Sequence, residues 1–105
     1  MSFHLSGSNF RLEHATLVGS LNDEEGNPQE IRFNLDEVLG NDDGRFSWGG
    51  VDFSETAQNI TLSIEGGAAV PVLRAILQSA DGEWCEADVN LAERLENING
   101  QLEFV

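Results

Sequence analysis

Residues 34–48 read NLDEVLGNDDGRFSW, and residues 90–104 read NLAERLENINGQLEF. Both stretches open with Asn-Leu, place a Glu three residues after that Asn, and then give Leu, Asn and Gly at matching positions. A repeated pattern of this kind indicates one supersecondary unit that the chain uses twice. The chain is therefore expected to fold as two copies of one small unit.

The repeat extends well beyond these two stretches. Residues 17–48 and 73–104, aligned at an offset of 56, share ten identities in 32 positions. The segments before them, 3–12 and 53–62, match at an offset of 50, so six additional residues enter the second copy. They fall in or near the Gly/Ala-rich segment 64–71, which is typical of a loop. Because a copy of about 50 residues would hold only a marginal core, the two copies are expected to bury their apolar faces against each other.

The local sequence is mostly typical of β-strands. Short segments that mix alternation with β-branched and aromatic residues predict strands at TLVGSL, EIRFNL, RFSW, NITLSI, VLRAIL, ADVNL and QLEFV. NDDG and NING predict tight hairpin turns, because Asp-Gly and Asn-Gly accept the positive φ that such turns require. Asn34 and Asn90 predict caps of single helical or 3₁₀ turns, in which the Asn accepts from an early backbone N–H and Glu37 or Glu93 reaches back. An all-β protein follows.

The charge balance excludes several classes of partner. The 105 residues include 19 acids, five arginines and no lysine, which gives a net charge of −14. Nucleic acids and anionic membrane surfaces attract cationic proteins, so neither is an expected partner. No apolar run approaches the roughly 18–20 residues of a membrane-spanning helix, and MSFHLSGSNF lacks the pattern of a signal peptide. A cytoplasmic or non-classically secreted protein is expected.

Enzyme chemistry and metal binding have no support in the sequence. Two widely separated histidines and one cysteine cannot make a zinc site, and NDDG lacks the alternating acids of a calcium loop. Adjacent acids such as Asp42 and Asp43 are typical of solvated turns rather than of a glycosidase pair. No cofactor, metal or catalysis is expected. What remains is a β scaffold with two equivalent sets of polar turn residues, which suit sugar hydroxyls and ordinary turn chemistry equally.

The tandem repeat, the NL-x-E-x-LxN-xx-G-xxx-[WF] pattern and the central W-xxxx-F-x-E-T segment (48–56) resemble the cyanovirin-N homologue family of mannose-binding lectins. The resemblance covers essentially the whole chain in order. It implies one all-β domain, residues 1–105, of two pseudo-symmetric lobes built from three-stranded sheets and β-hairpins. Each lobe would contain strands from both copies, with lobe A at about residues 1–38 and 94–105 and lobe B at about residues 39–93.

The resemblance also implies one sugar pocket per lobe. The matching positions in lobe B are Asn41, Asp43, Asp52, Glu55, Thr56, Gln78 and Ser79. Those in lobe A are Ser6, Asn22, Glu24, Asn97, Ile98 and Asn99, and more of the family's polar groups are replaced there. Gln78 and Ala80 stand where the family prototype has basic residues, and Leu5 replaces an amide. Weak binding, mainly through the lobe B pocket, is therefore expected.

Cysteine usage fits the same resemblance. The chain has a single cysteine, Cys85, which cannot form an internal disulfide. The positions of the prototype's half-cystines hold Gly7 with Leu21 and Ala57 with Leu77. Apolar packing can replace a buried bridge, so the fold is expected to form without disulfides.

The expected function is that of a lectin for terminal Manα1-2Man units, with mannose-containing oligosaccharides or glycoproteins as partners. The alternative is a protein-interaction or structural module that kept the fold and lost sugar binding, which the replacements at Leu5, Gln78 and Ala80 favour. The protein is expected to be a monomer, with a domain-swapped dimer as the alternative.

Overall fold

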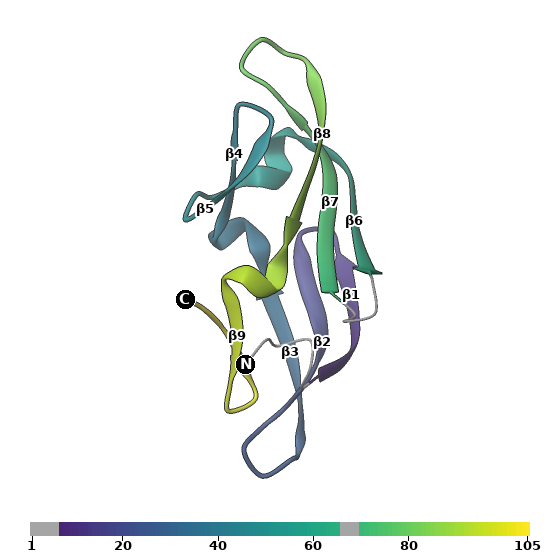
Figure 1. Ribbon diagram of the computed structural model, residues 1–105, viewed down its shortest axis with the longest axis vertical. Helices are drawn as coiled ribbons and strands as arrows, with labels where there is room; N and C mark the ends of the chain where they lie inside the picture. Colours follow the sequence, from purple (N-terminus) through teal and green to yellow (C-terminus); the bar gives the residue numbers. More distant parts are fainter. Residues whose placement is uncertain (1–6, 66–69) are drawn as a thin grey trace.

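Short amphipathic segments separated by turn residues produce an all-β chain, as the sequence predicts. In the computed structural model, which describes residues 7–65 and 70–105, they form ten strands and three 3₁₀ turns (Figure 1). The strands are β1 (Gly7–Glu13), β2 (Thr16–Asn22), β3 (Pro28–Asn34), β4 (Leu39–Asp42), β5 (Arg45–Trp48), β6 (Ala57–Glu65), β7 (Val70–Gln78), β8 (Trp84–Asn90), β9 (Leu95–Ile98) and β10 (Gln101–Phe104). The 3₁₀ turns are η2 (Leu35–Glu37), η3 (Phe53–Thr56) and η4 (Leu91–Glu93).

Each copy of the repeat builds the same set of elements. The first copy forms the antiparallel sheet β1–β2–β3, then η2, then the hairpin β4–β5. The second copy forms β6–β7–β8, then η4, then β9–β10. Strands β1, β4 and β9 were not among the predicted strands. For β4 and β9, four residues are too few to show an alternating pattern.

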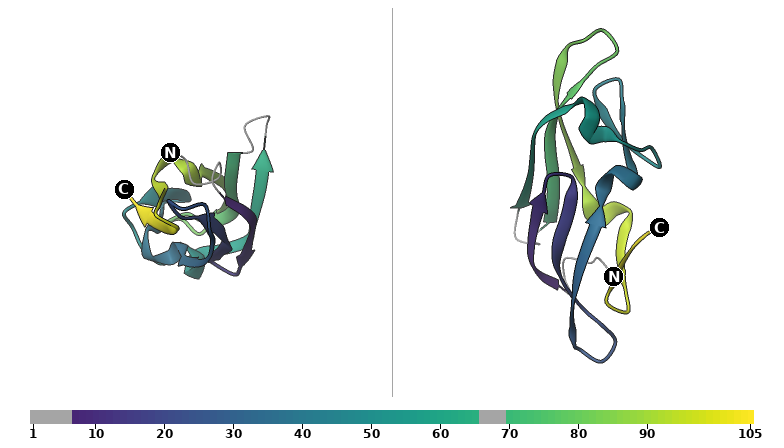
Figure 2. Two further views of the ribbon diagram at one scale, coloured as in Figure 1. Left: turned by 90° about the horizontal axis from the view of Figure 1, so that it is seen from below. Right: turned by 180° about the vertical axis from the view of Figure 1, so that it is seen from behind.

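The two copies exchange their hairpins. Strand β5 of the first copy packs against β8 of the second, and β10 of the second copy lies beside β3 of the first. The result is an elongated molecule of 49 × 26 × 21 Å with a sheet and a hairpin at each end (Figures 1 and 2). Below, lobe A means β1–β3 with β9–β10, and lobe B means β6–β8 with β4–β5. The lobe boundaries given above for residues 38/39 and 93/94 stay a prediction.

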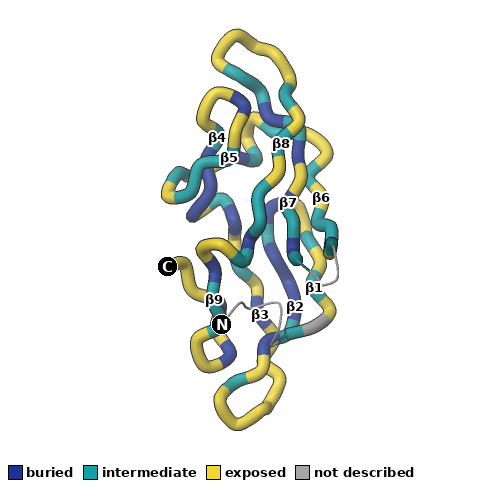
Figure 3. The backbone as a smooth tube through the Cα atoms, viewed as in Figure 1, coloured by how far each residue is buried: buried dark blue, intermediate teal, exposed yellow. Residues whose placement is uncertain are grey.

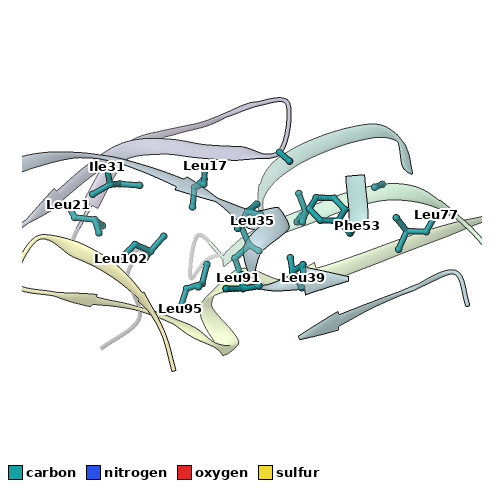
Figure 4. Packing of buried hydrophobic residues seen from close by; sticks show 14 residues of the cluster. Leu17, Leu21, Ile31, Leu35, Leu39, Phe53, Leu77, Leu91, Leu95 and Leu102 are labelled. Atoms are coloured by element: carbon teal, nitrogen blue, oxygen red, sulfur yellow. The ribbon is translucent and has the colours of Figure 1, made fainter. Parts of the chain in front are cut away.

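One hydrophobic core runs through both lobes. Four of the ten identities between the copies are leucine pairs, and all eight leucines are fully buried: Leu17/Leu73, Leu21/Leu77, Leu35/Leu91 and Leu39/Leu95. Figure 4 shows Leu35 and Leu91, which come from η2 and η4, between the lobe A leucines and Phe53 with Leu77. The backbone follows the same pattern, since buried positions line the interior of both lobes (Figure 3). Each copy therefore covers the apolar face of the other.

The predicted caps are confirmed for the asparagines. Oδ1 of Asn34 accepts from the backbone N–H of Asp36 at 3.0 Å, and Oδ1 of Asn90 accepts from that of Ala92 at 2.9 Å. The predicted return bond from Glu37 or Glu93 is wrong, since neither makes one within the described residues. Both Glu side chains are exposed, so water can solvate them in place of a cap N–H.

The two predicted hairpin turns are confirmed. Asp43 and Gly44 connect β4 to β5 with φ of 50° and 89°, and Asn99 and Gly100 connect β9 to β10 with φ of 51° and 84°. Two consecutive residues at positive φ define the tight turn that matches the twist of paired strands. The Gly44/Gly100 identity between the copies is therefore a backbone requirement.

The predicted loop at residues 64–71 is only partly correct. Ile64 pairs with Pro71 and Glu65 with Val70, so both ends of that segment extend β6 and β7, and residues 66–69 lie outside the described ranges. The first hairpin runs for 16 residues from Gly7 to Asn22, and the second for 22 from Ala57 to Gln78. The difference of six equals the change in repeat offset, so the insertion lengthens one hairpin.

The positions of the missing half-cystines are adjacent in the sheets. Gly7 pairs with Leu21 and Ala57 pairs with Leu77, and both leucines are fully buried. A Cβ on Gly7 would lie 2.5 Å from Cζ of Phe10 and 2.8 Å from Cδ2 of Leu21. Neighbouring side chains thus fill the space beside Gly7, and packing takes the place of a bridge.

An aromatic pair joins the lobes at their junction. The Trp48 and Phe104 rings stack with centroids 5.8 Å apart and an interplanar angle of 21°. These residues are equivalent in the two copies, at the offset of 56. The guanidinium carbon of Arg94 lies 4.9 Å from the Phe104 ring centroid. The end of β5 in lobe B is thereby fixed to the end of β10 in lobe A.

Replacing Phe104 by alanine is expected to lower the free energy of unfolding by about 1–2 kcal/mol, because the stack and the cation–π contact are both lost. Urea unfolding followed by tryptophan fluorescence measures the change. The matched control is Ile98→Ala, which removes a more exposed apolar side chain from the same hairpin and should cost less than about 0.5 kcal/mol. Equal losses in the two variants would show that the stack does not join the lobes.

Candidate functional site

In lobe B, two turns from different copies of the repeat are joined by a hydrogen bond. The backbone N–H of Ala80, in the β7–β8 turn, donates to Oδ1 of Asp43, in the β4–β5 turn, at 2.9 Å. A Cβ on Gly44 would lie 3.0 Å from Sγ of Cys85 on β8 and 3.7 Å from Cβ of Ser79, so the β4–β5 turn packs closely against the β7–β8 hairpin. The β7–β8 turn is also closed internally, since Oγ of Ser79 accepts from the Glu83 N–H at 3.1 Å.

Asn41 is the centre of this arrangement. Its Nδ2 donates to Oγ1 of Thr56 and to the backbone oxygen of Gln78, both at 2.8 Å, and its Oδ1 accepts from the Gly44 N–H at 2.8 Å. Both amide protons are thus used within the protein. Asn41 therefore connects β4, the end of η3 and the end of β7, and acts as a positioning residue.

The third segment of the site, η3, is fixed by Asp36. Its backbone oxygen accepts from the Asp52 N–H at 2.8 Å, and its carboxylate accepts from both the N–H and the hydroxyl of Ser54. Asp52 begins η3 at φ 60°, a conformation that Asp and Asn tolerate better than most residues. Asp52, Glu55 and Thr56 are all exposed. The left-handed backbone alone therefore accounts for an Asp at position 52, whether or not its side chain binds a ligand.

Lobe A repeats the same geometry. Nδ2 of Asn97 donates to the backbone oxygen of Asn22 at 2.8 Å, and its Oδ1 accepts from the Gly100 N–H at 2.8 Å. Oδ1 of Asn99 accepts from the Glu24 N–H at 3.1 Å, as Asp43 does from Ala80. Ile98 is exposed beside this turn. Ser6, the remaining predicted residue of this site, lies outside the described residues.

The two sites differ in the turn of the three-stranded sheet. Asp23 of lobe A stands at the position of Ser79, and its carboxylate accepts from the N–H groups of Glu25 and Asn27 at 2.9 Å and from Nε2 of Gln29 at 3.2 Å. Lobe A also has a groove of about 410 Å³ between residues 29–33 of β3 and residues 99–103, which cover the β9–β10 turn and most of β10. None of the predicted lobe B residues lines this groove.

Most of the predicted site residues are thus brought together in two groups. In lobe B, hydrogen bonds join Asn41 to Thr56 and Gln78, and the Asp43 and Ser79 turns meet. The sequence did not point to Asp36, which holds η3 in lobe B, or to Asp23, whose carboxylate closes the β2–β3 turn in lobe A. Asp23 aligns with Ser79, which was a predicted site residue, and this equivalence could have identified Asp23.

Among residues 7–65 and 70–105, no group of three or more His, Cys, Asp or Glu is arranged to hold a metal ion. Within the same ranges, no helix is long and apolar enough to cross a membrane.

Comparisons with known proteins agree with this geometry. The sequence profile of the CVNH domain matches residues 3–103. A cyanovirin-N homolog of Neurospora crassa is 41% identical, with 98% of this chain and 97% of that protein covered. The Gibberella zeae CVNH structure is 49% identical at a TM-score of 0.93, covering 98% of this chain and 96% of that one. A microvirin–mannobiose complex is 25% identical at a TM-score of 0.88, covering 99% and 98%.

Proposed function

The chain belongs to the cyanovirin-N homologue family, a family of carbohydrate-binding lectins and not of enzymes, and we propose that it binds terminal Manα1-2Man units of high-mannose glycans, mainly in lobe B. The observation that carries the proposal is the Asn41 network, which holds three chain segments in one polar surface. The preference for lobe B rests on the family's polar groups, more of which are kept there than in lobe A. The mannobiose bound by microvirin, which is similar over nearly the whole chain, supports a mannose disaccharide as ligand.

The groups left free around Asn41 suit sugar hydroxyls. Oγ1 of Thr56 accepts from Asn41, so its own proton is available to donate. Asp43 uses Oδ1 for Ala80, which leaves Oδ2 as an acceptor, and Glu55 offers a second exposed carboxylate. Because protein hydrogen bonds already order this surface, little conformational freedom is lost when a sugar binds.

The charge of the chain restricts the glycans it can take. A net charge of −14 should repel sialylated and sulfated glycans, so a neutral mannose terminus fits best. Ala80 offers no long side chain to close over the sugar, and the site is open. We expect a dissociation constant between roughly tens of micromolar and about 1 mM, which corresponds to about −4 to −7 kcal/mol.

A titration with Manα1-2Man followed by backbone amide shifts tests the proposal. The expected result is a set of saturable shifts at residues 41–44, 52–56 and 78–83, with smaller or no shifts at residues 22–24 and 97–99. Manα1-6Man serves as the control disaccharide and should shift these amides weakly. If Manα1-2Man causes no saturable shift anywhere, the lectin assignment is wrong, and the chain is the interaction or structural module considered above.

A further inference from the structure

The outer face of the β7–β8 pair carries a stripe of apolar and polar side chains, most of which lie outside the proposed pocket. Along β7, Leu73, Ala75 and Leu77 are buried, so the alternating residues Arg74, Ile76 and Gln78 face outward. Antiparallel pairing sets three residues of β8 opposite them, in the pairs Gln78/Trp84, Ile76/Glu86 and Arg74/Asp88. Successive pairs on one face lie roughly 7 Å apart along the strands, on the order of one sugar ring.

Trp84 stands at the end of this stripe that is nearest to the pocket. The residue is 47% exposed, although burial of an indole is strongly favourable. Its cross-strand partner Gln78 belongs to the pocket, since the Gln78 backbone oxygen accepts from Asn41. Cβ atoms of such partners lie about 4.5–5.5 Å apart, so the indole lies beside the residue whose backbone oxygen binds Asn41.

The stripe continues into a groove of about 410 Å³ on the same sheet. Its lining includes Asn59, Thr61, Arg74, Ile76, Glu86 and Asp88. Arg74 is held in place there, because its Nη2 donates to the Glu65 carboxylate at 2.6 Å and its Nη1 donates to that of Asp88 at 3.2 Å. The hydrogen bond from Arg74 lowers the pKa of Glu65. The groove therefore offers amide, hydroxyl and carboxylate groups beside the apolar Ile76, with Asp88 held by Arg74.

Among the described residues of lobe A, the positions equivalent to this stripe carry no exposed aromatic side chain. Pro28 stands at the position of Trp84 and Ser20 at that of Ile76. Val18 replaces Arg74 and is fully buried, with Arg11 and Arg32 as its cross-strand neighbours. Both arginines donate to Glu13, which draws their side chains together over this face. The outward-facing stripe of Trp84, Ile76 and Arg74 thus belongs to the second copy of the repeat alone.

We propose that Trp84 and the adjoining groove form an extended subsite of the lobe B pocket, which takes the inner sugar units of a neutral glycan longer than a disaccharide. This proposal rests on the proposed function of the pocket. The flat face of the indole packs against the C–H groups of a pyranose ring, and the groove takes the hydroxyl groups of the next unit. The terminal disaccharide unit fills the pocket, and only the sugar units that follow it along the glycan reach Trp84. A disaccharide alone therefore does not contact the indole.

Calorimetric titration of the full chain with Manα1-2Man and with a linear α1-2-linked mannotetraose tests the proposal. The wild type should bind the tetraose about three- to tenfold more tightly than Trp84→Ala does, because an aromatic contact contributes about that factor. The two proteins should bind the disaccharide within about twofold of each other. Trp84→Phe should recover most of the loss, and Ile64→Ala, at the far end of the same sheet, should bind like the wild type.

Fluorescence supplies a second readout, because Trp48 and Trp84 are the two tryptophans of the chain. In a Trp48→Phe background, the tetraose should shift the emission of Trp84 and the disaccharide should not. Equal affinities of wild type and Trp84→Ala for the tetraose, with normal disaccharide binding, would overturn the subsite alone. A wild type that binds neither sugar would overturn the proposed function, and the subsite with it.

Discussion

Replacing Asn41 by alanine is expected to abolish detectable Manα1-2Man binding by lobe B and to lower the free energy of unfolding by about 2–4 kcal/mol. Three hydrogen bonds are lost at once, each with a net contribution of about 1 kcal/mol, and the Gly44 N–H and Gln78 carbonyl lose their partner. The three segments that form the site are then no longer connected. Calorimetric titration and urea unfolding measure the two effects.

Asn97→Ala is the matched control for this variant. Asn97 makes the equivalents of two of these bonds in lobe A, to Asn22 and Gly100, so the stability should fall by at least about 1–3 kcal/mol. Because Asn97 lies in the other lobe, lobe B should keep its affinity for the disaccharide within about twofold. If Asn97→Ala removes binding and Asn41→Ala does not, lobe A holds the main pocket.

Replacing Leu35 by alanine is expected to cost about 3–5 kcal/mol of unfolding free energy, the largest loss of any single variant proposed. Leu35 is fully buried on η2, at the centre of the core that both lobes share. Its removal leaves a cavity that residues from both copies would have to fill. Leu91→Ala, its counterpart on η4, should cost a comparable amount.

Chemical unfolding with far-ultraviolet circular dichroism and tryptophan fluorescence tests this prediction. Both probes should report one transition in each variant, because the core is continuous. Ile64→Ala, an exposed position on β6, should change the stability by less than about 0.5 kcal/mol. Two separate transitions in the wild type would show instead that the lobes unfold independently.

The sequence was informative where the two copies agree. Leu35/Leu91, Asn34/Asn90 and Gly44/Gly100 are identical because burial, capping and positive φ each restrict the residue. The repeat predicted the caps and the turns, and in the structure its leucine identities prove to be core positions. Asn9 and Asn59 show the same effect, since each lies in a strand irregularity at φ of 58° and 55°.

The exchange of hairpins could not be derived from composition or periodicity. Residues of β4–β5 carry no local signal that they pack on the second sheet, because the two hairpin–sheet pairings are chemically alike. Only the family resemblance implied it. The same limit applies to Asp36, whose carboxylate holds Ser54 from 18 residues away along the chain.

The role of Asn41 also changed once its partners were known. The resemblance implied a residue that holds sugar hydroxyls, but both of its amide protons are used by Thr56 and Gln78. The site is thus an ordered frame with Asp43, Thr56 and Glu55 at its surface. Asn41 therefore enters the proposed site as a residue that orders it.

Intermolecular nuclear Overhauser effects to bound Manα1-2Man test the central claim most directly, because methyl groups report on each site. Sugar protons should show contacts to the methyl groups of Thr56 and Ala80, which lie where the turns of the two copies meet in lobe B. Contacts to the methyl groups of Ile98 alone, in lobe A, would contradict the assignment of the main pocket.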